Sequence, residues 1–158
     1  MNICHYHDKD ELEQWLETPE VASYQIDETA LVSIYDFVYE KWCQRATERD
    51  QVQPEDLSYS CKFASLFIKM LYGGVIEGNE HHQYNVIDGK IWDLSSQSQD
   101  VLSLKEKKVD IYFHDLYFFA NDDHLESLQS CMPRVMAWVN EYEARLKLNH
   151  EKSVSYKK

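Results

Sequence analysis

All four glycines of this chain lie within residues 73–89, and they constrain where the chain can turn. Gly73 and Gly74 follow an apolar segment and predict that a helix ends there, because glycine readily adopts the left-handed conformation that closes a helix. Asp88-Gly89 separates two runs rich in β-branched residues, which is a strong signal for a two-residue hairpin turn. The stretch therefore predicts a helix that leads into a β-hairpin.

Hydrophobic periodicity extends this prediction to the whole chain. The expected helices are residues 8–17, 28–48, 61–72 and, in two segments divided at Pro133, about 121–148; the expected strands are residues 75–76, 83–87 and 90–94, with one or two more within 109–119. This order predicts a single α+β domain over residues 1–148, in which N-terminal helices, one of them bearing a cysteine, and C-terminal helices pack on a small antiparallel sheet. Residues 149–158 are expected to form a frayed tail.

Composition and charge exclude several classes of protein. An apolar fraction of 44% predicts a packed core, and no apolar run approaches the ~20 residues that a membrane span needs. The net charge is −12, and residues 1–60 hold 14 acidic but only 4 basic side chains. This excess disfavours nucleic acid as a partner and favours a solvated surface or a basic protein partner. The polar N-terminus is unlike a signal peptide, so we expect a cytoplasmic protein, with export by another route left open.

The cysteines do not form a metal-binding or disulfide pattern. They are Cys4, Cys43, Cys61 and Cys131, and no two of them are spaced as C-x-x-C. We therefore expect free thiols and neither a metal ion nor an organic cofactor.

Cys61, His82 and Asp93 are the strongest candidates for chemistry. If Asp88-Gly89 is a two-residue turn, His82 and Asp93 become diagonal neighbours on one face of the hairpin, about 5–8 Å apart at Cβ. A carboxylate at that distance can orient the imidazole and leave its other nitrogen for a thiol. Cys61 begins the preceding helix, where the positive end of the helix dipole favours a thiolate. A nucleophile, a base and an orienting carboxylate would then meet.

The same three residues also allow a purely structural interpretation. Cys61 would then be a small core residue, His82 an ordinary strand residue and Asp93 a turn residue. Spacing alone does not exclude this alternative.

Motifs around these residues resemble those of the papain-like superfamily. The motifs are Cys61, His82-Gln83-Tyr84-Asn85, Gly89 and Trp92-Asp93-Leu94-Ser95, with Gly73-Gly74 after the cysteine helix. They are most similar to the transglutaminase-like and arylamine N-acetyltransferase branch, in which the order is Cys, His, Asp, and within it to small bacterial YunG-like proteins. The resemblance covers about residues 58–101 and implies that Cys61 is the nucleophile, His82 the base and Asp93 the orienting residue. Ser60 departs from the glutamine or glycine familiar before the cysteine, and only 20 residues separate Cys61 from His82, which leaves little room for a substrate-binding insertion.

Two functions remain open from the sequence. The first is a cysteine-dependent amide hydrolase or acyl transferase, of the peptidase, amidase or glutamine deamidase type, acting on a protein, a peptide or a small amide through a thioester. The second is a catalytically inactive scaffold whose acidic N-terminal third binds a basic protein. Aromatic residues within 112–119 are expected in the core, and an exposed subset of them would be a candidate binding patch.

Overall fold

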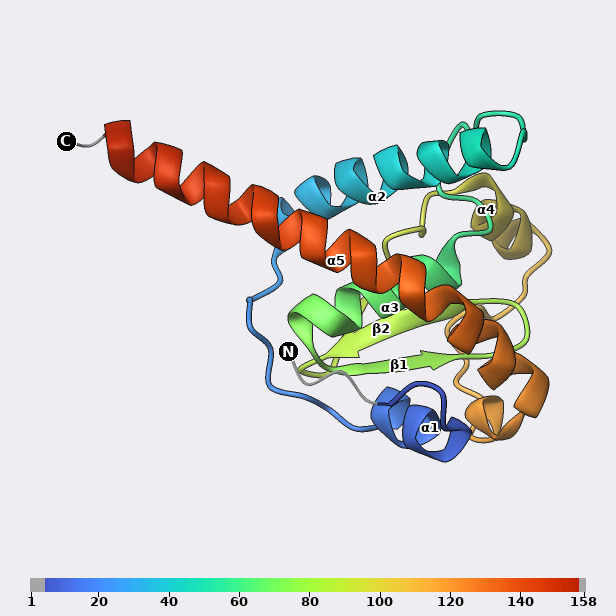
Figure 1. Ribbon diagram of the computed structural model, residues 1–158. Helices are drawn as coiled ribbons and strands as arrows, with labels where there is room; N and C mark the ends of the chain where they lie inside the picture. Colours follow the sequence, from blue (N-terminus) through green and yellow to red (C-terminus); the bar gives the residue numbers. More distant parts are fainter. Residues whose placement is uncertain (1–4, 157–158) are drawn as a thin grey trace.

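A computed structural model describes residues 5–156 of the chain, and the fold over this range is α+β (Figure 1). In chain order the elements are α1 (Lys9–Glu17), α2 (Glu28–Glu48), α3 (Cys61–Tyr72), β1 (Val75–Gly78), β2 (Gln83–Ile87), β3 (Lys90–Trp92), α4 (Gln99–Glu106), the 3-10 helix η1 (Phe118–Ala120) and α5 (Asp122–Tyr156). The predicted bounds of α2 and α3 are confirmed. None of the helices in this range has a stretch long and apolar enough to cross a lipid bilayer.

Helix α3 lies at the centre of the molecule. It packs on β1 and β2 on one side and against α5 on the other, and α5 crosses over it in Figure 1. Every residue from Ala64 to Tyr72 is consequently buried, whereas the sequence predicts only one apolar stripe. A helix that is covered on several sides provides a fixed base for its first residue, Cys61.

The three strands form an antiparallel sheet in the order β1-β2-β3. Ile87 pairs with Lys90 and Asn85 with Trp92, which confirms the predicted register. The turn residues Asp88 and Gly89 have φ of 50° and 76°, the left-handed values that a two-residue hairpin turn requires. The hairpin residues therefore lie on the faces that the sequence predicts.

The prediction of strands within residues 109–119 is wrong. These residues, all of them described, form turns and η1 instead. Their carbonyl groups bond to a side chain rather than to another strand: the Asn79 amide donates to the carbonyls of Ile111 (3.1 Å) and Phe113 (2.7 Å). Asn79 takes the place of a pairing strand, and no period-2 pattern is imposed on this loop.

The aromatic residues of this loop also divide differently from the prediction. Phe118 and Phe119 are buried as expected, but Phe113 is 61% exposed and Tyr117 is 78% exposed. Tyr112 is half-buried. Because the loop is not a strand beneath the sheet, part of it faces solvent.

The C-terminal region is one helix rather than two segments divided at Pro133. Pro133 lies inside α5 and is exposed, while Met132 and Val135 beside it are buried. The backbone hydrogen bond that proline cannot make is therefore lost on the solvent side of α5. Packing of the buried face keeps the chain helical on both sides of Pro133. Helix α5 also continues past the predicted end near Leu148, to Tyr156.

Candidate functional site

The hairpin brings His82 and Asp93 into direct contact. His82 precedes β2 and Asp93 follows β3, and His82 Nε2 lies 2.8 Å from Asp93 Oδ2. Both side chains are almost completely buried, with 2% and 4% exposed. His81 instead lies near Glu80, with 3.3 Å between Nε2 and Oε1, and its side chain is 44% exposed. The prediction that His82, not His81, lies beside Asp93 is confirmed.

Asp93 is held by further donors. Its Oδ2 also accepts a hydrogen bond from the Tyr112 hydroxyl at 2.9 Å, and its Oδ1 accepts from the Ser95 backbone N–H and hydroxyl, both at 3.3 Å. Tyr112 is itself fixed, because the Tyr84 hydroxyl donates to its carbonyl at 2.7 Å and the two rings meet edge to face. The carboxylate can therefore hold the His82 ring in one orientation.

Cys61 meets His82 at the N-terminus of α3. The thiol is half-buried, and Cys61 and His82 line a common hollow of about 140 Å³ together with Gln83 and His124. Since Asp93 occupies Nε2 of His82, Nδ1 is the ring nitrogen left for the thiol. The three residues predicted from the sequence thus lie together.

The charge of His82 depends on both neighbours. Burial lowers the pKa of His82, but hydrogen bonding and charge interactions with Asp93 and Cys61 outweigh burial and raise the pKa to about 9. His82 is therefore protonated at neutral pH while it contacts Asp93. An imidazolium beside a thiol is the partner that stabilises a thiolate.

A polar contact that the sequence analysis missed ties Cys61 to the sheet. The Ser65 hydroxyl donates to the Cys61 carbonyl at 2.6 Å and accepts from Gln83 Nε2 at 2.5 Å. Asn85 Nδ2 adds a bond to the Ser65 carbonyl at 2.9 Å. Because Gln83 adjoins His82 in the chain, this contact fixes the first turn of α3 relative to the imidazole. Buried Gln and Asn within a strand are the signal that could have revealed it.

His124 was missed as well. Its Nε2 lies 3.0 Å from Gln83 Oε1, and its ring packs on Phe118 with 4.2 Å between centroids. Burial, with a contribution from Lys62, lowers the pKa of His124 to about 4, so this histidine is neutral near pH 7. A neutral histidine donates one hydrogen bond, and here it orients Gln83.

Candidate donors for an oxyanion lie at the start of α3 and in the loop before it. The backbone N–H of Cys61 begins α3 and has no acceptor within the helix, as at any helix N-terminus. The loop before α3 holds four candidates for a second donor; of these, the Gln53 amide bonds to Cys43 and Thr47, and the Tyr59 N–H bonds to Asp100. The remaining two are Ser58, whose hydroxyl accepts from the Asp100 N–H, and Gln51, which is exposed and lines the cleft beside Cys61.

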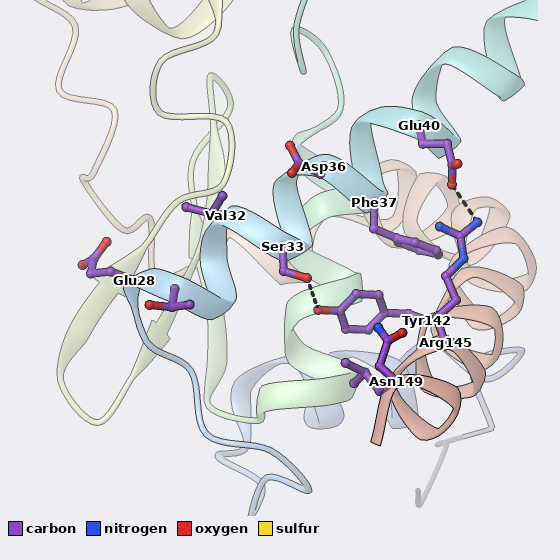
Figure 2. A pocket seen from close by; sticks show the side chains of 11 residues that line it. Glu28, Val32, Ser33, Asp36, Phe37, Glu40, Tyr142, Arg145 and Asn149 are labelled. Carbon is purple, nitrogen blue, oxygen red and sulfur yellow. Dashed lines mark hydrogen bonds and ion pairs between the residues drawn. The ribbon is translucent and has the colours of Figure 1, made fainter. Parts of the chain in front are cut away.

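Two larger hollows differ in their position relative to Cys61. A cleft of about 780 Å³ opens beside Cys61 between α2, the loop before α3, and α5. A second hollow, of about 840 Å³, lies between α2 and α5 and contains none of the three site residues. Ser33 and Tyr142 lie 3.1 Å apart between their hydroxyls, and Arg145 bonds to Glu40 at 2.8 Å. Figure 2 shows both pairs in this hollow. Of these two hollows, the first borders Cys61.

Cys43, Cys61 and Cys131 are free thiols, whereas Cys4 lies outside the described residues. Within residues 5–156, no group of three His, Cys, Asp or Glu side chains could hold a metal ion. Comparison with known proteins gives no significant match to a family model, to a curated protein or to a solved structure.

Proposed function

We propose that this protein is a cysteine-dependent amide hydrolase or acyl transferase with a papain-like core. The observation that carries the proposal is that buried His82 lies 2.8 Å from Asp93 and lines a common hollow with Cys61, the first residue of a helix. A helix that begins at the cysteine and packs on a hairpin bearing histidine and aspartate is also the arrangement implied by the resemblance of the motifs. No cofactor is needed for this chemistry.

In the first half-reaction, the Cys61 thiolate attacks the carbonyl carbon of an amide. A C–S bond forms, the carbonyl π electrons move to oxygen, and the Cys61 N–H donates to the oxyanion. His82 then gives its proton to the nitrogen of the leaving amine, and the C–N bond breaks to leave a thioester. Asp93 keeps the imidazole oriented throughout.

In the second half-reaction, water or an amine attacks the thioester carbon. His82 takes a proton from the attacking group, and the Cys61 thiolate leaves. Water gives hydrolysis of a peptide, or deamidation of a glutamine side chain, and an amine gives acyl transfer. The substrate is a protein, a peptide or a small amide, and its amide must reach the cleft beside Cys61.

Ester turnover tests the proposal without knowledge of the substrate. p-Nitrophenyl acetate should release a burst of nitrophenolate that matches the protein concentration, and intact-mass analysis should find one acetyl group on the Cys61 peptide. Cys61→Ser and His82→Gln should abolish the burst, and Cys43→Ser, which removes a thiol outside the site, should keep it. Acetylation that is spread over lysines and unchanged in Cys61→Ser would contradict the proposal.

The second candidate, a scaffold that binds a basic protein, is favoured by the acidic rim of the hollow between α2 and α5. Glu28, Asp36 and Glu40 come from α2, and Val32 between them is 65% exposed (Figure 2). Glu28 pairs with Lys90 and Glu40 with Arg145, whereas Asp36 makes no ion pair among residues 5–156. Anisotropy titration with a fluorescent lysine-rich peptide tests this function. Asp36→Asn should weaken binding more than Asp110→Asn, and equal effects of the two changes would refute a site in this hollow.

A further inference from the structure

The cleft beside Cys61 contains positive charge, although the chain as a whole is acidic. Three cationic side chains line it: Arg45 from α2, Arg49 directly after the end of α2, and Lys62 from the first turn of α3. The whole chain has 28 acidic and 16 basic residues, so carboxylates are in excess as partners. Three cations in one cleft next to the candidate nucleophile are therefore unexpected on composition alone.

Two of these cations have no ion-pair partner within residues 5–156. Arg134 bonds to Glu48 at 2.8 Å and Arg145 bonds to Glu40 at 2.8 Å, whereas Arg45 and Arg49 make no such pair in the described chain. The Arg45 guanidinium lies instead over aromatic rings, 4.9 Å from the Trp42 centroid and 5.0 Å from that of Phe63. Burial, followed by the charges of Arg49 and Arg134, lowers the pKa of Arg45. The Arg45 guanidinium is thus held over two rings, and neither Arg45 nor Arg49 has an ion-pair partner among residues 5–156.

Two of the three carboxylates that line the same cleft, Asp56 and Asp100, are engaged elsewhere. Asp56 accepts from the backbone N–H groups of Ser58 and Gln99, both at 2.8 Å. Asp100 accepts from the backbone N–H groups of Tyr59, at 2.8 Å, and Val101, at 2.9 Å. Glu55 is exposed and makes no ion pair among residues 5–156. Asp56 and Asp100 therefore shape the loop before α3, and none of the three carboxylates forms an ion pair with Arg45 or Arg49.

We propose that this cleft is an anion-binding subsite, and that the acyl substrate of Cys61 carries a carboxylate that Arg45 and Arg49 bind. Guanidinium groups bind a carboxylate through paired hydrogen bonds, and the rings of Trp42 and Phe63 hold one guanidinium in a fixed plane. Lys62, which follows Cys61 in the chain, extends the positive surface from the arginines to the thiol, although its Nζ also donates to the Ser127 hydroxyl at 2.7 Å. This inference rests on the proposed function, because it assigns a substrate class to the same nucleophile.

Two alkylating reagents that differ only in charge test the subsite. Iodoacetate carries a carboxylate and iodoacetamide a neutral amide, and both are attacked by the same thiolate, with loss of iodide. The measured quantity is the ratio of their rate constants at Cys61, followed by peptide mass spectrometry and divided by the ratio for free N-acetylcysteine amide. This normalised ratio cancels the ionisation and nucleophilicity of Cys61. An acidic protein without the subsite should give a ratio below 1, since it repels iodoacetate.

We expect a ratio above 1, which falls by about fivefold when both Arg45 and Arg49 are replaced by glutamine. Arg49→Gln alone, at an exposed side chain, should give part of this fall even if the Arg45 change impairs folding. Arg145→Gln is the matched control, because it also removes one positive charge from an arginine that lies over an aromatic ring, 5.0 Å from the Phe37 centroid. Arg145 lines the hollow between α2 and α5, which shares no lining residue with the cleft beside Cys61. Its ratio should equal that of the wild type.

Failure of the subsite and failure of the enzyme give different results. Fast reaction with iodoacetamide but a normalised ratio at or below 1, or equal ratios in Arg49→Gln and Arg145→Gln, overturns the anion-binding subsite and leaves the proposed nucleophile intact. Reaction of Cys61 with both reagents no faster than that of the free thiol overturns the proposed function itself.

Discussion

Replacement of Asp93 by asparagine should change how the stability of the protein depends on pH. Contact with Asp93 and Cys61 raises the pKa of His82 from 6.5 to about 9 despite burial, and the His82 side chain is 2% exposed. The folded state therefore binds a proton that the unfolded state releases between these two values. Each pKa unit corresponds to about 1.4 kcal/mol, so this histidine contributes on the order of 3 kcal/mol to the free energy of unfolding. That contribution is complete below about pH 6.5 and is lost as the pH rises through about 9.

Urea unfolding at several pH values measures this effect, and an NMR titration of the His82 ring measures its cause. In the wild type, the free energy of unfolding should fall from about pH 6.5 to about pH 9. In Asp93→Asn the titration of His82 should move down by at least about one unit, because burial then opposes a smaller attraction, and the fall in stability should shrink in proportion. Asp110→Asn, which removes an exposed carboxylate, should behave as the wild type. A wild-type stability that is flat over this interval, or a His82 that titrates near 6.5, would refute the reasoning.

Three further changes test other parts of the account. Tyr112→Phe removes a hydrogen-bond donor to the buried Asp93 carboxylate and should lower the free energy of unfolding, measured in urea, by about 1–2 kcal/mol. Tyr117→Phe, at a residue that is 78% exposed, should leave the free energy of unfolding unchanged. Equal losses in the two variants would show that the bond from Tyr112 to Asp93 does not stabilise the fold. Gly74→Ala should lower the free energy of unfolding by several kcal/mol, since the φ of Gly74 is +68° and a Cβ would lie 2.4 Å from a carbonyl oxygen. Gly89→Ala should lower it by only about 1–2 kcal/mol, because Gly89 has a φ of +76° but open space around it. Similar melting temperatures of the two variants would contradict this difference. His124→Gln should make the free energy of unfolding less sensitive to acid. Burial and Lys62 hold the pKa of His124 at about 4, so the stability of the wild type falls as the pH drops from about 6.5 towards 4. The same fall in stability at acid pH in His124→Gln would exclude this role.

The hairpin and the cysteine helix could be predicted because their signals are local. Gly73 ends the helix, and Asp88-Gly89 adopts the turn that its residue types favour, so the register follows within a few residues. The contact between His82 and Asp93 is a consequence of that register. Side-chain alternation therefore predicted a contact between residues that are 11 positions apart.

The surroundings of the site could not be predicted in the same way, because they depend on long-range packing. The loop that supplies Tyr112 resembles a strand in composition, but in the folded molecule the side chains of Asn79 and Tyr84 bond to its carbonyls. The cleft beside Cys61 is formed by α2, α4, α5 and the loop before α3, which no local pattern brings together. Pro133 suggested a helix boundary that the buried face of α5 overrides.

The pH dependence of Cys61 alkylation tests the central claim most directly. Iodoacetamide should modify Cys61 near neutral pH faster than it modifies free cysteine, because an adjacent imidazolium favours the thiolate that attacks the reagent. His82→Gln should slow this reaction near neutral pH and restore the rise of an ordinary thiol, while His81→Gln, at the exposed neighbour, should not. A wild-type Cys61 that reacts no faster than free cysteine near neutral pH, and whose rate rises only near pH ~8.5, would contradict the assignment of these residues as a nucleophile and its base.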